Sequence, residues 1–251
     1  MANEAKHITE HYLAPTARKT HYDIYCFGAN PEECLHLLSN LQQFEEPDIT
    51  SSHKTSIIGL EHFEYDAYRC NRKGSSHRKE YSDIEQSSKK KIEEKLCVND
   101  SAVIFDEIKS KPSEAFYREN FIRLFSSHYS SVKKYKAHIS KHFKIPKQKI
   151  PIWFIAEDVT PLGTSFVCRN KLKQGEEPAF PLFFPDIEKL FLSSSELEGI
   201  IFADHYSGTL TIVKRNKEAI TSLKLHHHYQ GEPLFFHDNA KIASIAVKMP
   251  F

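Results

Sequence analysis

Two carboxylates on either side of a turn are the residues of this sequence best suited to chemistry. Asp48 follows Pro47 at the start of a short polar stretch, and Glu61 ends the apolar run Ile57-Ile58-Gly59-Leu60. Two carboxylates on neighbouring strands can hold a hard divalent cation such as Mg²⁺, which prefers oxygen ligands. A cation held in this way can activate water against a phosphodiester. The sequence therefore predicts a metal site at Asp48 and Glu61.

The element that must position this pair is a hairpin. Residues 48–52 and 55–67 read as two strands, joined by a turn at His53 and Lys54. Side chains alternate between the two faces of a strand, so Glu61 and Phe63 should share one face. The other face should carry His62, Glu64 and Asp66, which form either a rival metal-binding set or a solvated surface.

A helix is expected just before the hairpin, from Pro31 to about Phe44. Asn30 suits its N-cap, and Pro31 suits the first helical position. Glu33 lies in its first turn, where a carboxylate is favoured by the helix dipole. If this helix packs beside the hairpin, Glu33 can complete the metal site or orient a metal-bound water.

The order of these elements resembles the PD-(D/E)XK nuclease superfamily, also called restriction-endonuclease-like, over about residues 31–158. The resemblance rests on Glu33, on Pro47-Asp48 and on Glu61-His62-Phe63. It implies an α/β (α+β) fold, with a mixed sheet flanked by helices and followed here by a C-terminal extension. It also implies Mg²⁺, or Mn²⁺, at Asp48 and Glu61, and hydrolysis of phosphodiester bonds in nucleic acid. DNA is the commoner substrate, and restriction or antiviral phage defence is the expected setting.

One position departs from the family pattern, because Phe63 stands where a Lys is usual, two residues after the Glu. Lys54 at the hairpin turn is one candidate replacement, and His62 is a candidate proton carrier. His62 would need a strand bulge to reach the face of Glu61. The alternative to an enzyme is a catalytically degenerate protein of this fold that binds nucleic acid or a partner protein.

A long periodic pattern predicts a helix over residues 113–142, whose second half is basic. No Asp or Glu occurs from Asn120 to Ala156. This charge would attract a nucleic-acid backbone, although a solvated helix face explains it equally well. The residues predicted to bind nucleic acid are Lys133, Lys134, Lys136 and Lys141.

Two further sequence patterns are candidates for functional sites. Arg123 and His128 have the Arg-x4-His spacing of HEPN-type ribonucleases, which would cleave RNA without a metal ion. Residues 226–228 are three consecutive histidines, and such a run is typical of a surface loop more often than of a metal site.

The rest of the chain predicts further elements of a sheet. Residues 151–156 form a continuous apolar run, typical of a buried strand, and Glu157-Asp158 at its end are site candidates by position. A short helix is expected at residues 186–192, and strands at 199–203 and 210–214.

Length and charge predict one domain over residues 1–251, with a nuclease-like core at about 20–160. A charged insertion is expected at about 68–100 and a C-terminal lobe at about 160–251. Neither a P-loop nor a GxGxxG sequence occurs. Without a signal peptide or an apolar run of membrane-spanning length, a cytoplasmic protein is expected, as a possible homodimer or part of a larger complex.

Cysteine spacing predicts free thiols. The five cysteines are odd in number, widely spaced and without a CxxC pair, so neither a disulfide framework nor a thiolate zinc site is expected. They are Cys26, Cys34, Cys70, Cys97 and Cys168.

Overall fold

A seven-stranded mixed sheet lies at the centre of the molecule, in the order β1-β10-β9-β8-β4-β3-β2. The computed structural model describes residues 3–13, 24–53, 56–71, 74–107, 109–110, 112–160, 180–205, 208–227 and 241–247. Strands β4, β8 and β9 run parallel to one another. Strand β3 runs antiparallel to β4, and β10 runs antiparallel to β9. The strands are β1 (Ile24–Phe27), β2 (Gln42–Gln43), β3 (Ile49–His53), β4 (Ser56–Tyr65), β8 (Ile152–Asp158), β9 (Gly199–Asp204) and β10 (Leu210–Lys214). The predicted α/β class is confirmed.

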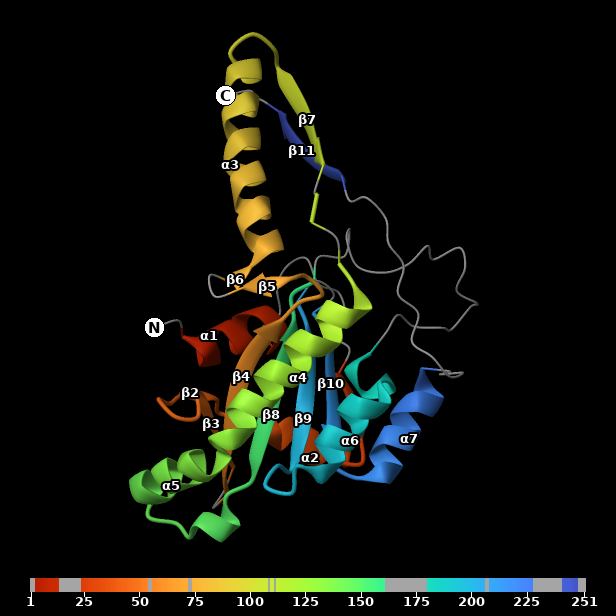
Figure 1. The fold of residues 1–251 in the computed structure, drawn as a ribbon. Coiled ribbons are helices and arrows are strands. Elements are labelled where there is room, and N and C mark those ends of the chain that lie inside the picture. The colour runs from red at the N-terminus through yellow and green to blue at the C-terminus, as the bar shows by residue number, and fades with distance from the viewer. Residues whose placement is uncertain are drawn as a thin grey trace.

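Helices cover both faces of this sheet (Figure 1). One face carries α4 (Glu114–Ser130), α5 (Val132–Phe143), α6 (Pro185–Ser193) and α7 (Lys217–His226), and the other carries α1 (Glu4–Ile8), the π-helical turn η1 (Thr9–Leu13) and α2 (Pro31–Leu37). Short 3₁₀ turns occur at η2 (Lys147–Lys149) and η4 (Pro181–Phe183). Alternate residues of β8 serve the two cores, since Phe154 packs toward α4 and Trp153 toward the α1 and α2 side. This strand is buried on both faces, as its apolar run predicts.

The hairpin predicted around residues 48–67 is present as the antiparallel pair β3 and β4, with Ile49 opposite Leu60. The helix before it begins at Pro31 as predicted but ends at Leu37, earlier than expected. Gly28 makes the turn from β1 into this helix with φ +75°, and a Cβ there would lie 2.6 Å from the Ala219 Cβ. Glycine is therefore needed both for the backbone angle and for the close packing of α7.

The single helix predicted over residues 113–142 is wrong in one respect, because the structure has two helices that meet at Ser131. Ser113 caps α4 as expected, since its Oγ accepts a hydrogen bond from Phe116 N. Ser130 Oγ donates to the Ser127 carbonyl at 2.7 Å at the end of α4. Serine side chains compete with the helical backbone for hydrogen bonds, which explains why the helix is interrupted at the serine pair.

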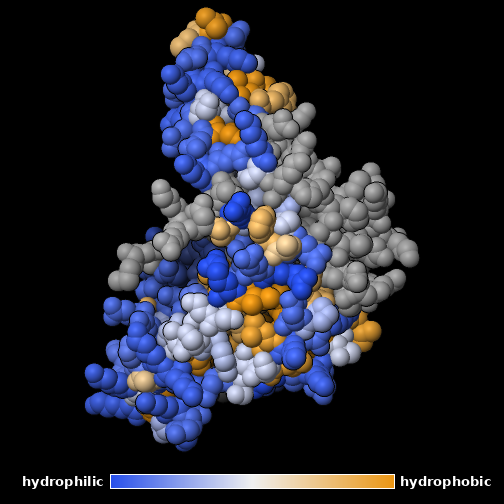
Figure 2. Space-filling model, viewed as in Figure 1, coloured by the Kyte–Doolittle hydropathy of each residue, from blue (hydrophilic) through white to orange (hydrophobic). Residues whose placement is uncertain are grey.

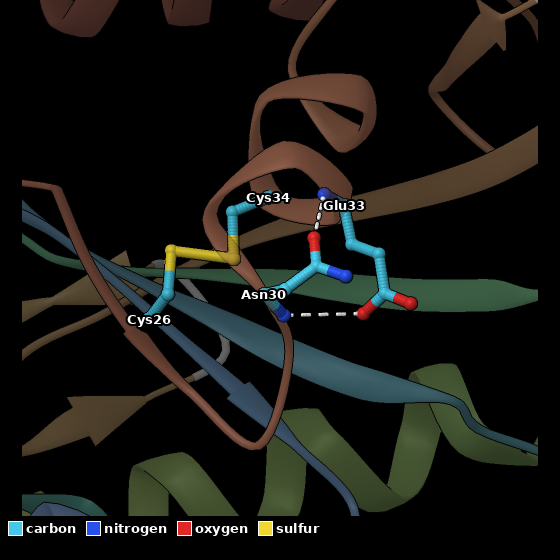
Figure 3. Close-up of a disulfide and its surroundings, with 4 residues drawn as sticks. All are labelled: Cys26, Asn30, Glu33 and Cys34. Carbon is cyan, nitrogen blue, oxygen red and sulfur yellow. Dashed lines mark hydrogen bonds between the residues drawn. A yellow bond between two sulfur atoms is a disulfide. The ribbon is translucent and has the colours of Figure 1, made fainter.

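The expectation of free thiols is wrong for two cysteines. Cys26 of β1 and Cys34 of α2 form a disulfide whose Cα atoms are 6.6 Å apart (Figure 3). Figure 3 also shows the cap of α2, in which Asn30 and Glu33 exchange two hydrogen bonds. The turn at Gly28 folds α2 back on β1, and spacing along the sequence alone did not indicate this proximity. Cys97 is a free thiol, and Cys168 lies outside the described residues.

The charged insertion forms an arm that projects from the sheet (Figure 1). It contains β5 (Cys70–Asn71), β6 (Gly74–Ser75), the long helix α3 (Ser76–Leu96) and β7 (Ser101–Glu107), and β7 pairs antiparallel with β11 (Lys241–Val247). Ile104 and Asp106 of β7 face α3, whereas Phe105 is 70% exposed. Apolar surface is visible at the tip of the arm and along its strand side in Figure 2.

No helix within the described ranges is both long enough and apolar enough to cross a bilayer.

Candidate functional site

The hairpin brings Asp48 and Glu61 together beside the middle of β4, where Glu61 is opposite Phe154 of β8. Asp48 directly precedes β3, and the pairing of Ile49 with Leu60 places it opposite Glu61. Its N–H lies 3.3 Å from Glu61 Oε2 and donates to it, while the His62 N–H donates to Asp48 Oδ2 at 3.0 Å. The predicted pair is therefore linked both directly and through the next residue along β4.

The two carboxylates affect each other electrostatically. Burial raises the pKa of Asp48, and the nearby charge of Glu61 raises this pKa further. The hydrogen bond from the His62 N–H acts in the opposite direction but does not cancel these effects. Two carboxylates that repel each other in this way gain most from a bound cation, because its charge removes their repulsion.

Glu61 is held from its other side by two helices. Its Oε1 lies 2.6 Å from the Nδ1 of His128 on α4 and accepts a 2.6 Å hydrogen bond from the Tyr135 hydroxyl on α5. An ionised carboxylate only accepts hydrogen bonds, so Nδ1 of His128 carries the proton. The Nε2 of a neutral His128 is then left as a base.

Phe63 supports this histidine. Its ring stacks on the His128 ring, with centroids 5.3 Å apart and planes 14° apart. The residue that lies two positions after Glu61, Phe63, thus packs against an imidazole. Sequence reasoning missed this role, because it considered His128 only together with Arg123. Arg123 is exposed on α4, whereas His128 packs against the sheet.

His62 points to the opposite face of the sheet, as strand alternation predicts. Its Nε2 lies 2.7 Å from Oε2 of Glu157, the penultimate residue of β8. Burial alone would lower the pKa of His62, but the hydrogen bond and charge of Glu157 outweigh it, with help from Glu64 and Asp48, and the pKa is raised. His62 is therefore placed to pair with Glu157, on the face opposite Glu61.

Glu157 is the centre of a second cluster. Its side chain is fully buried, and His7 Nε2 of α1 lies 3.0 Å from Oε2. Oε1 accepts a 2.7 Å bond from the Tyr12 hydroxyl and lies 2.7 Å from His205 Nδ1. Burial alone would raise the pKa of Glu157, but the surrounding donors, His62 foremost, hold it well below its usual range.

The next residue faces the other way. Asp158 lies on the α4 side, and its Oδ1 accepts a 2.9 Å bond from Thr160 N. Burial of this carboxyl, reinforced by the charge of Asp204, raises the pKa of Asp158 to about 7. The two site candidates at the end of β8 are thus divided between the two faces of the sheet.

Within the described part of the chain, one group of three His, Cys, Asp or Glu residues has ligand atoms within 4.8 Å of one another, and it consists of His7, His62 and Glu157. Asp48, Glu61 and Glu33 do not form such a group. Glu33 is exposed, and its Oε2 accepts a bond from the Asn30 N–H, so it acts as a helix cap. The sequence marked Glu157 and His62 separately but gave no signal for His7, which comes from an N-terminal helix.

The other predicted residues are scattered. Lys54 and His228 lie outside the described residues. His226 is the last residue of α7 and His227 is its C-cap, so these two histidines end a helix and do not lie in the expected loop. Lys134 pairs with Glu46 at 2.7 Å and Lys136 with Glu196 at 2.7 Å, whereas Lys133 and Lys141 are exposed. Of the rival set on β4, Glu64 is exposed and Asp66 is buried, with its Oδ1 accepting a bond from Tyr68 N.

Comparison with known proteins gives no relative: no family model, no curated protein and no solved structure matches this chain.

Proposed function

We propose that this protein is a metal-dependent nuclease that hydrolyses phosphodiester bonds in nucleic acid, DNA foremost, in restriction or antiviral defence. The observation that carries the proposal is the approach of Asp48 to Glu61, with His128 bound to the far oxygen of Glu61. Mg²⁺ or Mn²⁺ is the ion that this carboxylate pair would hold.

The donor set fits a hard cation. Asp48 Oδ2 and Glu61 Oε2 each accept one backbone N–H bond, which leaves lone pairs free on both carboxylates. Burial and, after it, the charge of Glu61 raise the pKa of Asp48, and a bound cation would offset both effects. When bound, such an ion lowers the pKa of a water ligand and stabilises charge on the phosphate oxygens.

His128 supplies the proton acceptor in this proposal. Its Nδ1–H bond to Glu61 fixes the ring and the tautomer, so that Nε2 can take a proton from the attacking water. The water oxygen forms a bond to phosphorus as the bond from phosphorus to the leaving sugar oxygen breaks. That oxygen then takes a proton from solvent. Tyr135 and Phe63 keep Glu61 and His128 in place.

The element order also supports the proposal. Helix α2, strands β3 and β4, helix α4 and strand β8 follow one another along the chain in the order on which the nuclease resemblance rests, with the arm inserted after β4. In the sheet, β3, β4 and β8 are neighbours. The exposed Lys133 and Lys141 on α5 supply positive charge for a nucleic-acid backbone. A cytoplasmic location belongs to the same proposal, since that is where this substrate is met.

Cleavage assays test the proposal. Labelled single- and double-stranded DNA and RNA are incubated with the protein and Mg²⁺ or Mn²⁺, then with EDTA. We expect cleavage that EDTA stops, and we expect Asp48→Asn and Glu61→Gln to abolish it while circular dichroism shows both variants folded. Glu32→Gln is the matched control, because Glu32 is an exposed carboxylate on α2 that lies 3.5 Å from His36 and away from the proposed site. Cleavage at the wild-type rate in both site variants would overturn the assignment, and cleavage that persists in EDTA would point to Arg123 and His128.

One observation favours a second function, which is binding without turnover. The arm exposes apolar residues, with Val98 81% and Phe105 70% exposed. Exposed apolar surface of this kind is typical of contact with another protein. A protein that binds nucleic acid in a salt-dependent way, or forms a stable complex through the arm, but cuts no substrate would be the degenerate alternative.

A further inference from the structure

We propose that His7, His62 and Glu157 bind a first-row transition-metal ion such as Zn²⁺, at a site separate from Asp48 and Glu61. Glu157 Oε2 lies 3.0 Å from His7 Nε2 and 2.7 Å from His62 Nε2. The three atoms come from α1, β4 and β8, which are far apart along the chain. The ligand set of two imidazoles and one carboxylate is the one found in many catalytic zinc sites.

The spacing of these atoms suits a shared ion. Ligand atoms about 2.0–2.1 Å from zinc and roughly 90–110° apart are separated from one another by about 2.8–3.4 Å. The two distances from Glu157 Oε2 lie within or just below this range. All three ligand atoms lie within 4.8 Å of one another, so small movements of the side chains would bring them around one ion.

The partners of the two Glu157 oxygens differ in part. His62 Nε2 lies 2.7 Å from Oε2, whereas Oε1 accepts the Tyr12 hydroxyl and contacts His205 Nδ1. His7 Nε2 lies beside both oxygens, 3.0 Å from Oε2 and 3.1 Å from Oε1. Donors that surround a metal-binding carboxylate orient it and are a regular part of metal sites. Tyr12 and His205 are therefore positioning residues, which hold the Glu157 carboxylate toward the two imidazoles.

Ligand chemistry distinguishes this site from the Asp48 and Glu61 pair. Imidazole nitrogens favour zinc, iron, copper or nickel, whereas carboxylate oxygens suit Mg²⁺ and Mn²⁺. The His7 side chain is 35% exposed, so an ion can enter from solvent and can keep water in its open positions. The rival explanation of this cluster is that Glu157 is a buried carboxylate held by hydrogen bonds alone, because four donors already surround it.

Metal binding to tag-free protein tests the inference, and it does not depend on nuclease activity. After treatment with a chelator, the protein is titrated with Zn²⁺ by calorimetry and with Co²⁺ by visible absorption. We expect one ion per chain and a Co²⁺ d–d band, since imidazole ligation gives stronger visible absorption than water ligation. His7→Ala should weaken the affinity at least about tenfold and change the band, because even outer-sphere partners affect affinity by about that factor.

Control variants separate this site from other histidines and from the proposed nuclease site. His138→Ala removes a half-exposed histidine whose Nδ1 lies 3.1 Å from Glu46, and it should leave Zn²⁺ affinity unchanged. Glu61→Gln should likewise keep the Co²⁺ band, so the failure of one site is not mistaken for the failure of the other. His7→Ala is preferred to Glu157→Gln because His7 is partly exposed and its loss leaves the core intact. Absence of stoichiometric binding, or binding that His7→Ala does not change, would overturn the metal assignment and favour the hydrogen-bonded carboxylate.

Discussion

At the residue scale, His62 joins the two clusters described above. Its backbone N–H donates to Asp48 on the hairpin, and its imidazole reaches Glu157 on the other face of the sheet. Neighbouring residues of one strand thus belong to different sites, since Glu61 faces the helices α4 and α5. A displacement of β4 at this point would disturb both clusters, although their ligand atoms do not overlap.

His128 offers the sharpest test at this scale. We expect His128→Gln to lower kcat for metal-dependent cleavage by roughly 10²–10⁴-fold, the usual contribution of a general base. Glutamine can still donate a hydrogen bond to Glu61 but cannot accept the proton of the attacking water at neutral pH. Mn²⁺ affinity, measured by calorimetry, should change little, because Asp48 and Glu61 remain.

Tyr135→Phe is the companion variant for His128. It removes the other hydrogen bond to Glu61 Oε1 without touching a proton acceptor. Its kcat should therefore fall much less than that of His128→Gln. Equal losses in the two variants would show that both residues only hold Glu61, and that the base is elsewhere.

Sequence reasoning predicted the carboxylate pair of Asp48 and Glu61 but missed the histidines that contact the buried carboxylates, and the reason is physical. The approach of Asp48 to Glu61 follows from a short turn and strand alternation, which are local properties of the chain. His128 and His7 reach their carboxylates only because α4 and α1 pack at particular positions on the sheet. Such packing depends on contacts between distant segments, and a single sequence does not reveal it.

At the element scale, the arm depends on charged contacts between α3 and β7. Asp106 Oδ1 accepts a 2.8 Å bond from Lys91 Nζ, and its other oxygen accepts from Ser88. The Lys91 bond, followed by the Ser88 bond, lowers the pKa of Asp106. A carboxyl whose folded pKa is lowered stabilises the structure above its unfolded pKa of about 3.9 and loses that contribution as the pH falls through the folded pKa.

We therefore expect the α3 and β7 contact to loosen as the pH falls from about 5 toward 2. Hydrogen exchange followed by mass spectrometry should show faster exchange of α3 amides than of β8 amides over this range, after correction for the intrinsic pH dependence. In the Asp106→Asn variant, the α3 amides should exchange faster at pH 7 than in the wild type. Their corrected exchange rates should also change less as the pH falls. An α3 whose protection is the same in both proteins across this range would show that Asp106 does not hold the arm.

The insertion shows how far composition alone can predict an element. Its charge predicted an exposed, partly helical segment, and α3 is such a helix. The pairing of β7 with β11 was not predicted, because β8, β9 and β10 lie between the two strands along the chain. Likewise, the break at Ser131 divides one amphipathic pattern into two helices, since both α4 and α5 keep the same apolar face toward the core.

At the scale of the whole molecule, the Cys26–Cys34 disulfide joins the edge strand β1 to α2, a helix that covers one face of the sheet. The cysteines are 8 residues apart in sequence, and closing so short a loop in the unfolded chain is worth about 2–3 kcal/mol in the chain-entropy treatment. We expect dithiothreitol to lower the free energy of unfolding in urea by about this amount. Cys26→Ala is the control: it should already be less stable and should not respond to the reductant. An equal response of both proteins would contradict a role for this bond in stability.

The sequence predicted individual strands of the sheet but not the order in which they pair. The apolar runs at β4, β8, β9 and β10 are each long enough and β-branched enough to indicate a strand. These apolar runs do not indicate which strands are neighbours in the sheet. For example, β10 lies between β9 and β1, and β1 comes much earlier in the chain. Pairings between distant segments require loop closure, so they follow from the energetics of the whole chain.

The pairing of β7 with β11 has a consequence for biosynthesis. The ribosome makes β7 well before β11, so the edge of β7 that β11 later covers stays unpaired through the synthesis of β8, β9 and β10. An open edge that carries residues as apolar as Val103 and Phe105 is a template for pairing with another nascent chain. The arm is thus the last part of the described fold that can be completed, and the part that most benefits from a chaperone during translation.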